Sequence, residues 1–378
     1  MKKSDYLFIL ISFVIWRVAI IIIAFFAIKN IPIFSQNYFG GGFSTYQTNP
    51  IFWGHLNFDG EHYLSIAQSG YKPLEYFFFP VFPRLIQIIS SGKPLIDLAW
   101  TGLFVSNISF LAALMGMYKL IKIDFDVKVA KVNTILFLVF PTSFYFGTYY
   151  TESIFLALVV WTFYFARTKN YIFASILASV ASATRVIGLV LLPVLLIEWF
   201  FDKKKNILNF FEIIFISPIG LVTYMYYLLK QTGDPLIFLH QVSIFGEQRS
   251  STLVTLPQVF YRYLFEILPH VSYSYFPNVF TTYLEFLMAV IFLILILICF
   301  FNLRLSYSVY ALFAFLIPAF AGSFSSMPRY VLAMFPIFIL SAIYISRIPK
   351  VYKYVIYFGM IVLFVAAEGL FWRGYWLS

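Results

Sequence analysis

The sequence predicts an all-α membrane protein that crosses the bilayer many times. Of its 378 residues, 62% are hydrophobic and 11% are charged, whereas a soluble globular domain is roughly half apolar. The apolar residues gather in runs of about 18 to 25, the length that an α-helix needs to span a bilayer. Basic residues stand in short clusters between these runs, as orientation signals do. The net charge of +10 therefore does not indicate a nucleic-acid partner.

We expect eleven spans, each bounded by a change from apolar to polar residues. The first is too long for the core of a signal peptide and lacks a small-residue cleavage site, so we expect it to remain as a helix. Arg185 and Gly188 interrupt one apolar stretch, which we divide into two spans. The predicted spans are residues 6–28, 95–118, 130–148, 150–167, 170–184, 186–201, 207–229, 279–301, 305–322, 330–346 and 352–371.

The positive charges predict the orientation. More than half of the 26 Lys and Arg residues lie at the N-terminus and in the short connections that would share its side, which places that side in the cytoplasm. Two long segments, residues 29–94 and 230–278, then lie outside, and so does the C-terminus. We see no internal repeat and expect residues 1–378 to form a single membrane domain. The outer segments contain neither Asn-x-Ser/Thr nor cysteine, which favours a prokaryotic plasma membrane over the endoplasmic reticulum.

The stretch NFDGEHYLSIAQSGY places Asp59, Glu61 and His62 within four positions of the first outer segment. In a helix, Asp59 and His62 would share one face and Glu61 would point elsewhere. Aspartate is a common N-cap, so Asp59 can begin this helix and Gly70 can end it. A capping aspartate can also act as a general base. By itself, the pair of carboxylates Asp59 and Glu61 is only weak evidence for a catalytic site.

Other candidate residues stand at the outer ends of apolar spans. Glu152, Arg185 and Arg329 are ionisable groups at membrane level, where they are costly, so the set suggests a polar cavity at one face. The planar guanidinium suits phosphate, although arginines at span ends also extend to the interface for solvation alone. No phosphate-binding glycine motif is present, and the single cysteine, Cys299, lies in an apolar run. Asp59, Glu61 and His62 have no diagnostic metal-ligand spacing, so we expect no metal and no obligatory cofactor.

FDGEHYLSIAQSGY, followed by EYFFFPVFPRLI, resembles the W-D-x-x-H-F…I-A-x-x-G-Y…F-F-P-x-F-P signature of the PIG-V family. That family includes the second mannosyltransferase of GPI-anchor assembly and its prokaryotic relatives. FPTSFYFGTYYTESIFLAL, ATRVIGLV and PRYVLAMFPIF resemble later family segments and occur in the same order. The sequence departs from the family at Phe58, where the family has tryptophan, and at Ile187, where it has asparagine. Only GDPLIFLHQ in the second outer segment bears a faint likeness.

The resemblance implies a GT-C glycosyltransferase fold with its active site at the outer or lumenal face. It also implies a sugar, mannose in that family, carried on polyprenyl or dolichyl phosphate. The family's acidic residue maps onto Asp59 and its histidine onto His62. Its Tyr-x-Glu pair maps onto Tyr150 and Glu152, and its arginine onto Arg185.

Our hypothesis is therefore a membrane glycosyltransferase in which Asp59 is the general base and His62 orients it. The acceptor would be a hydroxyl of a glycolipid, a glycan or a protein, and membrane lipids would surround the spans. We expect these residues to bind the substrates: Glu61, Tyr150, Glu152, Arg185, His240 and Arg329.

Two alternatives stay open. A transporter or flippase of lipid-linked sugars would place charges near the bilayer midplane, and Arg17, Glu212, Glu285 and Glu368 are candidates for such charges. The chain could also be a non-catalytic subunit that stabilises a partner enzyme.

Overall fold

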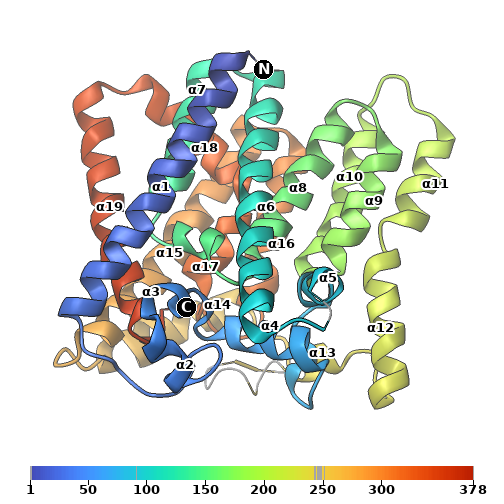
Figure 1. The fold of residues 1–378 in the computed structure, drawn as a ribbon. Helices are drawn as coiled ribbons and strands as arrows, with labels where there is room; N and C mark the ends of the chain where they lie inside the picture. Colours follow the sequence, from blue (N-terminus) through green and yellow to red (C-terminus); the bar gives the residue numbers. More distant parts are fainter. Residues whose placement is uncertain (1, 91, 242–243, 245–248, 251, 378) are drawn as a thin grey trace.

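The computed structural model describes residues 2–90, 92–241, 244, 249–250 and 252–377, and the regular structure of these residues is helical (Figure 1). Shorter 3₁₀ and π segments connect several helices. The α-helices are α1 (Lys3–Asn30), α2 (Phe43–Thr48), α3 (Pro50–Trp53), α4 (Asp59–Ser69), α5 (Val81–Ile89), α6 (Leu95–Asp124), α7 (Val127–Val139), α8 (Glu152–Arg167), α9 (Tyr171–Ser182), α10 (Leu191–Phe200), α11 (Ile207–Ile216), α12 (Ile219–Thr232), α13 (Ile237–His240), α14 (Leu256–Tyr261), α15 (Phe276–Asn302), α16 (Leu305–Ala319), α17 (Met327–Tyr330), α18 (Phe335–Arg347) and α19 (Lys350–Trp372).

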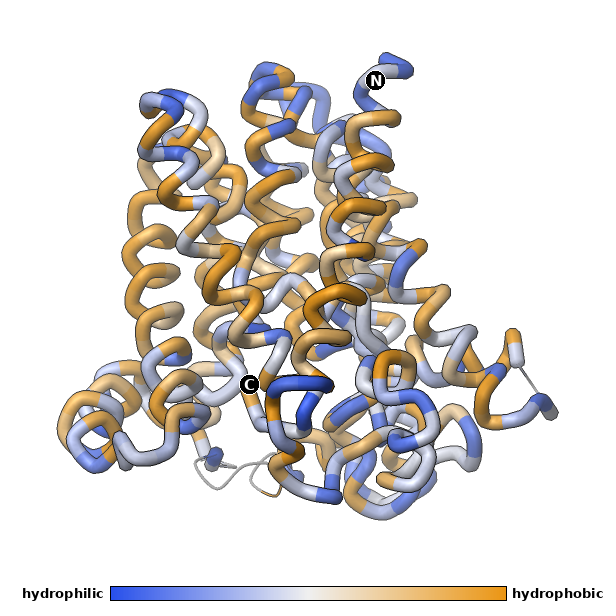
Figure 2. Tube along the Cα trace, turned by 60° about the vertical axis from the view of Figure 1, so that its left-hand side comes forward, coloured by the Kyte–Doolittle hydropathy of each residue, from blue (hydrophilic) through white to orange (hydrophobic). Residues whose placement is uncertain are grey.

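The long helices stand side by side as a bundle with two different ends. The N-terminus lies at one end, together with the α6–α7, α10–α11 and α18–α19 connections (Figure 1). The short helices α2 to α5, α13 and α14 lie in the other half, with the C-terminus. Hydrophobic residues occupy the middle of the bundle, and hydrophilic residues gather toward both ends (Figure 2). The predicted all-α architecture is thus confirmed, and the two long segments share one end.

Five helices are long and apolar enough to cross a membrane: Lys3–Asn30, Leu95–Asp124, Ile207–Thr232, Phe276–Asn302 and Lys350–Trp372. The pair Met327–Ala333 and Phe335–Arg347, bent by 81°, makes a sixth if it is counted as one span. Large apolar side chains are exposed on these helices, including Ile15, Phe104 and Phe301, and lipid tails can cover such faces. The chain is therefore an integral, multi-pass membrane protein, and the number of eleven spans stays a prediction.

The predicted span 130–148 is wrong in its second half. Helix α7 ends at Val139, and a 3₁₀ turn follows at Ser143–Gly147. Phe140 is extended, with ψ 139, because the residue before a proline disfavours the helical conformation and Pro141 follows it. The irregular segment is buried, as non-helical backbone at membrane depth must be. This segment leads to Tyr150 and to the start of α8.

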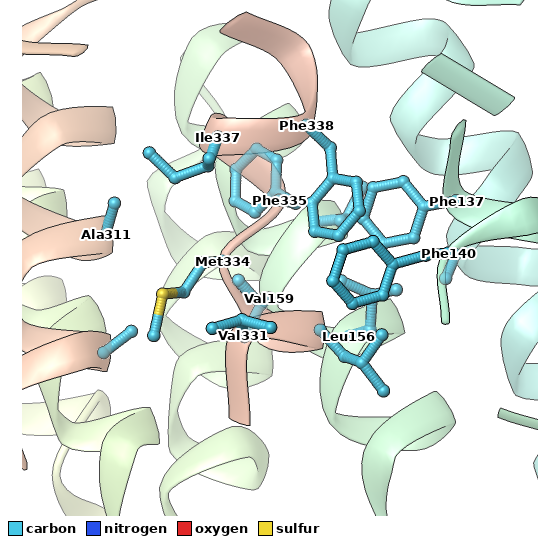
Figure 3. Packing of buried hydrophobic residues seen from close by; sticks show 14 of the residues in the cluster. Phe137, Phe140, Leu156, Val159, Ala311, Val331, Met334, Phe335, Ile337 and Phe338 are labelled. Carbon is cyan, nitrogen blue, oxygen red and sulfur yellow. The ribbon is translucent and has the colours of Figure 1, made fainter. Parts of the chain in front are cut away.

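Aromatic packing fixes the bent pair of α17 and α18 against α7 and α8 (Figure 3). The ring of Phe338 stacks on Phe137 at 4.0 Å and meets Phe140 edge-on at 5.0 Å. The ring of Phe335 meets Phe163 of α8 at 4.9 Å. Such pairs stabilise a core beyond the area that they bury, by about 0.5–1.5 kcal/mol each. They hold the bend that carries Arg329.

Candidate active site

A cavity of about 360 Å³ lies among α4, α8, α13, α16 and α17, in the half of the molecule away from the N-terminus (Figure 1). This volume is within the range of small-molecule sites, about 300–1,000 Å³. Apolar side chains of residues 77–79, 186–187, 238–239, 317–318 and 320–321 form much of the wall. The charged and phenolic lining residues are Asp59, Tyr63, Tyr150, Glu152, Arg185, Arg249, Arg329 and Tyr330.

A tight turn brings Asp59 into this cavity. Phe58 has φ 58 and ψ −117, and the N–H of Gly60 donates to the carbonyl of Asn57 at 3.3 Å. This is a type II′ turn with phenylalanine at a position that favours glycine, a backbone cost of about 1–3 kcal/mol. The predicted capping role of Asp59 is wrong, because Phe58 occupies the N-cap position. Gly70 does end the helix, with φ +79.

Four predicted residues form one chain of alternating charges. Nη1 of Arg329 donates to Oδ2 of Asp59 at 2.5 Å, and Nε of Arg329 lies 3.5 Å from Oε1 of Glu152. Nη1 of Arg185 donates to the same Oε1 at 2.6 Å. The side chains of Arg329 and Glu152 are only 6% and 4% exposed. Buried charges of this kind need partners on every side, so the four residues act as a unit.

Arg249 is a cavity residue that the sequence did not single out. Its guanidinium lies 6.0 Å from the ring of Tyr330, which Arg185 and Arg329 approach to 5.5 and 5.7 Å. Three arginines thus surround one aromatic ring, and Asp59 and Glu152 are the carboxylates among the described lining residues. In the sequence Arg249 is one basic residue among several in the second outer segment, and no spacing links it to Arg329.

Tyr150 lines the cavity as well. Its hydroxyl donates to the carbonyl of Asn57 at 2.7 Å, and its ring lies 5.5 Å from the guanidinium of Arg329. This phenol therefore ties the turn that carries Asp59 to the segment before α8. Its ring also packs near the guanidinium of Arg329, which pairs with Asp59.

His62 and Glu61 lie on α4 beside the cavity and are not among the described residues that line it. The imidazole of His62 stacks on Phe78 at 4.7 Å, and its Nδ1 lies 3.8 Å from Oε1 of Glu75. Burial lowers the pKa of His62, but Glu75, Asp59 and Glu61 outweigh it and hold the pKa above 6.5. Burial raises the pKa of Glu61.

The pKa of Asp59 is shifted in the opposite direction to that of Glu61. Burial raises the pKa of Asp59, but the charge and hydrogen bond of Arg329 outweigh burial and hold that pKa below 3.8. Asp59 is therefore ionised at neutral pH, and its proton affinity is reduced as long as Arg329 is bound to it.

His240 ends helix α13, and its Nδ1 lies 2.6 Å from Oδ2 of Asp234. The side chain is 61% exposed, and in the described part of the chain its neighbours Phe238 and Leu239 line the cavity while His240 does not. Residues 242–243, 245–248 and 251 of this second outer segment lie outside the described residues. The predicted role of His240 in substrate binding stays a prediction.

Among the described residues, no group of three or more His, Cys, Asp or Glu side chains is placed to hold a metal ion. Within the cluster that the sequence suggested, the Asp59 carboxylate bonds to Arg329, and His62 faces Glu75.

The fold resembles that of ArnT from Cupriavidus metallidurans, a crystal structure with bound undecaprenyl phosphate, with a TM-score of 0.53 and 15% identity. The alignment covers 94% of this chain and 63% of that chain. Two structures of the Archaeoglobus fulgidus oligosaccharyltransferase match less closely. The apo form has a TM-score of 0.43 and 13% identity, and the alignment covers 96% of this chain and 56% of that chain. The complex with Zn and sulfate has a TM-score of 0.47 and 16% identity, and the alignment covers 93% of this chain and 53% of that chain.

No model of a known protein family matches the chain, and no curated protein sequence does either. The chain spans 63% of the length of ArnT, so the likeness concerns the membrane fold. The helical architecture and this likeness agree with the fold that the sequence predicts. The protein is an integral, multi-pass membrane protein with the GT-C glycosyltransferase fold.

Proposed function

We propose that this protein is a membrane glycosyltransferase. It transfers a sugar from a polyprenyl- or dolichyl-phosphate carrier to an acceptor hydroxyl, in the cavity at the end opposite the N-terminus. The GT-C fold supports this reaction class, and the ArnT crystal structure that shares the fold contains bound undecaprenyl phosphate. The resemblance to the PIG-V family favours mannose as the sugar.

One observation carries the proposal: Asp59 shares its cavity with three arginines, Arg185, Arg249 and Arg329. Among the described lining residues, the three guanidinium charges exceed the charge of the two carboxylates, Asp59 and Glu152, so this part of the wall has a cationic excess. Arginine recognises phosphate oxygens through paired N–H donors. A lipid phosphate is the anion that a membrane cavity of this kind would receive.

Asp59 acts as the general base. It takes the proton of the acceptor hydroxyl while that oxygen forms a bond to the anomeric carbon of the sugar. A positioned base typically contributes about 10²–10⁴-fold to the rate. In the present structure Arg329 is bonded to Asp59, which weakens the base. When the donor phosphate enters, it competes for Arg329, and the carboxylate gains proton affinity at the moment when it is needed.

The bond that breaks joins the anomeric carbon to the phosphate oxygen, and the electron pair leaves on that oxygen. Arg185, Arg249 and Arg329 stabilise the charge that develops on the phosphate, in a site where burial strengthens such interactions. His62 acts indirectly, because its contact with Glu75 holds the loop of residues 75–79, which contributes Phe77 to Phe79 to the cavity wall.

The experiment uses the purified full chain in detergent with radiolabelled polyprenyl-phosphate sugars and a crude acceptor-lipid extract. Label should appear in an acceptor product with the wild-type protein. Asp59→Asn should fold and bind the donor lipid, yet lose transfer by at least about 10²-fold, the smallest contribution typical of a base.

Asp97→Asn is the matched control, because Asp97 lies in the first turn of α6, outside the described lining of the cavity. Its activity should equal that of the wild type. Full activity of Asp59→Asn would remove Asp59 from the base role. Transfer without any sealed compartment would exclude a transporter as the source of the signal, and activity of the chain alone would exclude a purely supporting subunit.

A further inference from the structure

Glu285 is a carboxylate in the spanning helix α15 to which the proposed reaction assigns no step. The residue is only 6% exposed, and a buried carboxylate is costly unless its oxygens are hydrogen-bonded. Its Oε2 accepts from the hydroxyl of Tyr263 at 3.0 Å, and its Oε1 accepts from the backbone N–H of Ser326 at 3.3 Å. The second contact joins α15 to the residue that directly precedes α17.

Ser326 has a backbone conformation that serine seldom adopts. Its φ of 68 and ψ of 6 lie in the left-handed region, which costs an L residue about 1–2 kcal/mol. The carbonyl of Ser326 accepts the N–H groups of Arg329 and Tyr330, each at 3.0 Å. The direction in which α17 starts, and therefore the position of Arg329, depends on this turn being held.

The same turn binds the second cavity arginine. Nη2 of Arg249 donates to Oγ of Ser326 at 2.9 Å and contacts the carbonyl of Ser325 at 3.4 Å. Arg249 and Arg329 come from different segments, and both line the cavity. One turn thus sets the distance between two guanidinium groups.

We propose that Glu285 is a positioning residue that holds Ser326 in the left-handed conformation and so places Arg249 and Arg329 to receive the donor phosphate. The inference rests on the proposed function, because that function assigns the two arginines to phosphate. It also gives a fixed structural role to a carboxylate that the transporter alternative would use as a membrane charge.

The test measures binding of farnesyl phosphate, a short lipid monophosphate, to the purified full chain in detergent. Glu285→Ala should raise its Kd by roughly tenfold or more, because the buried N–H of Ser326 would lose its acceptor. Glu285→Gln should change the Kd less than about threefold, because its amide oxygen can still accept from Ser326. The KM for the acceptor should stay unchanged in both variants.

Glu368→Ala is the matched control, since Glu368 is a fully buried carboxylate on α19 and is not among the described residues of the cavity wall. It should bind farnesyl phosphate as the wild type does. If Glu285→Ala fails to fold, Tyr263→Phe takes its place, and the loss of one contact should raise the Kd by about two- to fivefold. Wild-type affinity in the folded variant, or an equal loss in Glu368→Ala, would overturn the positioning role.

A readout without ligand separates this inference from the proposed function. If Glu285 and Arg249 act on the same turn, the shifts in thermal midpoint of Glu285→Ala and Arg249→Ala should not add in the double variant. Coupled shifts with no binding of farnesyl phosphate by the wild type would contradict the proposed function and leave the positioning supported. Additive shifts would contradict the positioning.

Discussion

Arg329 makes two contacts with carboxylates, and a donor phosphate would have to compete with both. Its Nη1 bonds to Asp59, and its Nε faces Glu152. A guanidinium can hold several acceptors in fixed directions, whereas an ammonium group is a single point charge. In the proposed reaction, Arg329 would therefore set both the strength of the base and the position of the phosphate.

Arg329→Lys should retain the positive charge and lose this bridging. We expect kcat/KM for the lipid-phosphate donor to fall by about 10²-fold, comparable to the loss of one stabilising donor at a developing anion. The KM for the acceptor should change little. Steady-state kinetics with each substrate varied in turn measures both effects.

Arg84→Lys serves as the control, because Arg84 is an exposed residue of α5 outside the described lining of this cavity. Its kinetics should match those of the wild type. Equal losses toward donor and acceptor in Arg329→Lys would argue for a structural role of Arg329 instead.

The raised pKa of His62 predicts that the stability of the fold depends on pH. Its pKa in the folded protein lies above the ordinary value of 6.5 despite burial, because of Glu75, Asp59 and Glu61. Protonated His62 therefore stabilises the fold fully below pH 6.5, and this contribution is lost as the pH rises through the folded-state pKa. The thermal midpoint of the wild type minus that of His62→Gln should decrease as the pH is raised from 6 to 9. A difference that stays constant over this range would show that His62 does not titrate with the fold.

Among the elements, the apolar helices could be predicted because their composition alone requires them, and α4 could be predicted from its polar and apolar spacing. The turn before α4 could not, because a positive φ is normally marked by glycine and Phe58 occupies that position. Pro141 was a visible sign that the span 130–148 is interrupted. The contact of Arg249 with Ser326 joins distant segments of the chain, so no local pattern reveals it.

The break between α9 and the 3₁₀ turn at Val186–Val190 is an element whose geometry depends on glycine. A Cβ on Gly188 would lie 2.4 Å from the backbone carbon of Ala181 and 2.5 Å from the backbone nitrogen of Ser182. Backbone atoms cannot yield as a flexible side chain can, so the turn would have to move, and Arg185 moves with it.

Gly188→Ala should therefore lower the free energy of unfolding by about 1–3 kcal/mol, as overpacking does, and weaken binding of farnesyl phosphate. Thermal unfolding and ligand titration in detergent measure the two effects. Gly359→Ala in α19 is the control, because a Cβ there meets no atom within 4 Å. Unchanged stability and affinity in Gly188→Ala would mean that the break can shift without displacing Arg185.

At the scale of the whole molecule, the largest lysine cluster and the cavity lie at opposite ends. The lysine cluster Lys203–Lys205 belongs to the α10–α11 connection at the N-terminal end, and the helices that carry Asp59 and Arg329 lie in the other half (Figure 1). Basic connections stay in the cytoplasm, so the structure, together with this rule, predicts a cavity that faces away from the cytoplasm. A lipid-linked sugar would then have to be presented on the outer leaflet.

Cysteine labelling in intact cells tests this orientation. Cys299 is buried, and Cys299→Ala provides a background without thiols into which one exposed cysteine is placed. Lys72→Cys, beside α4, should react with a membrane-impermeant maleimide from outside, because the first long segment is expected there. Lys204→Cys should react only after the cells are permeabilised. The reverse pattern would place the cavity in the cytoplasm, where the same arginines would meet lipid phosphates of the inner leaflet instead.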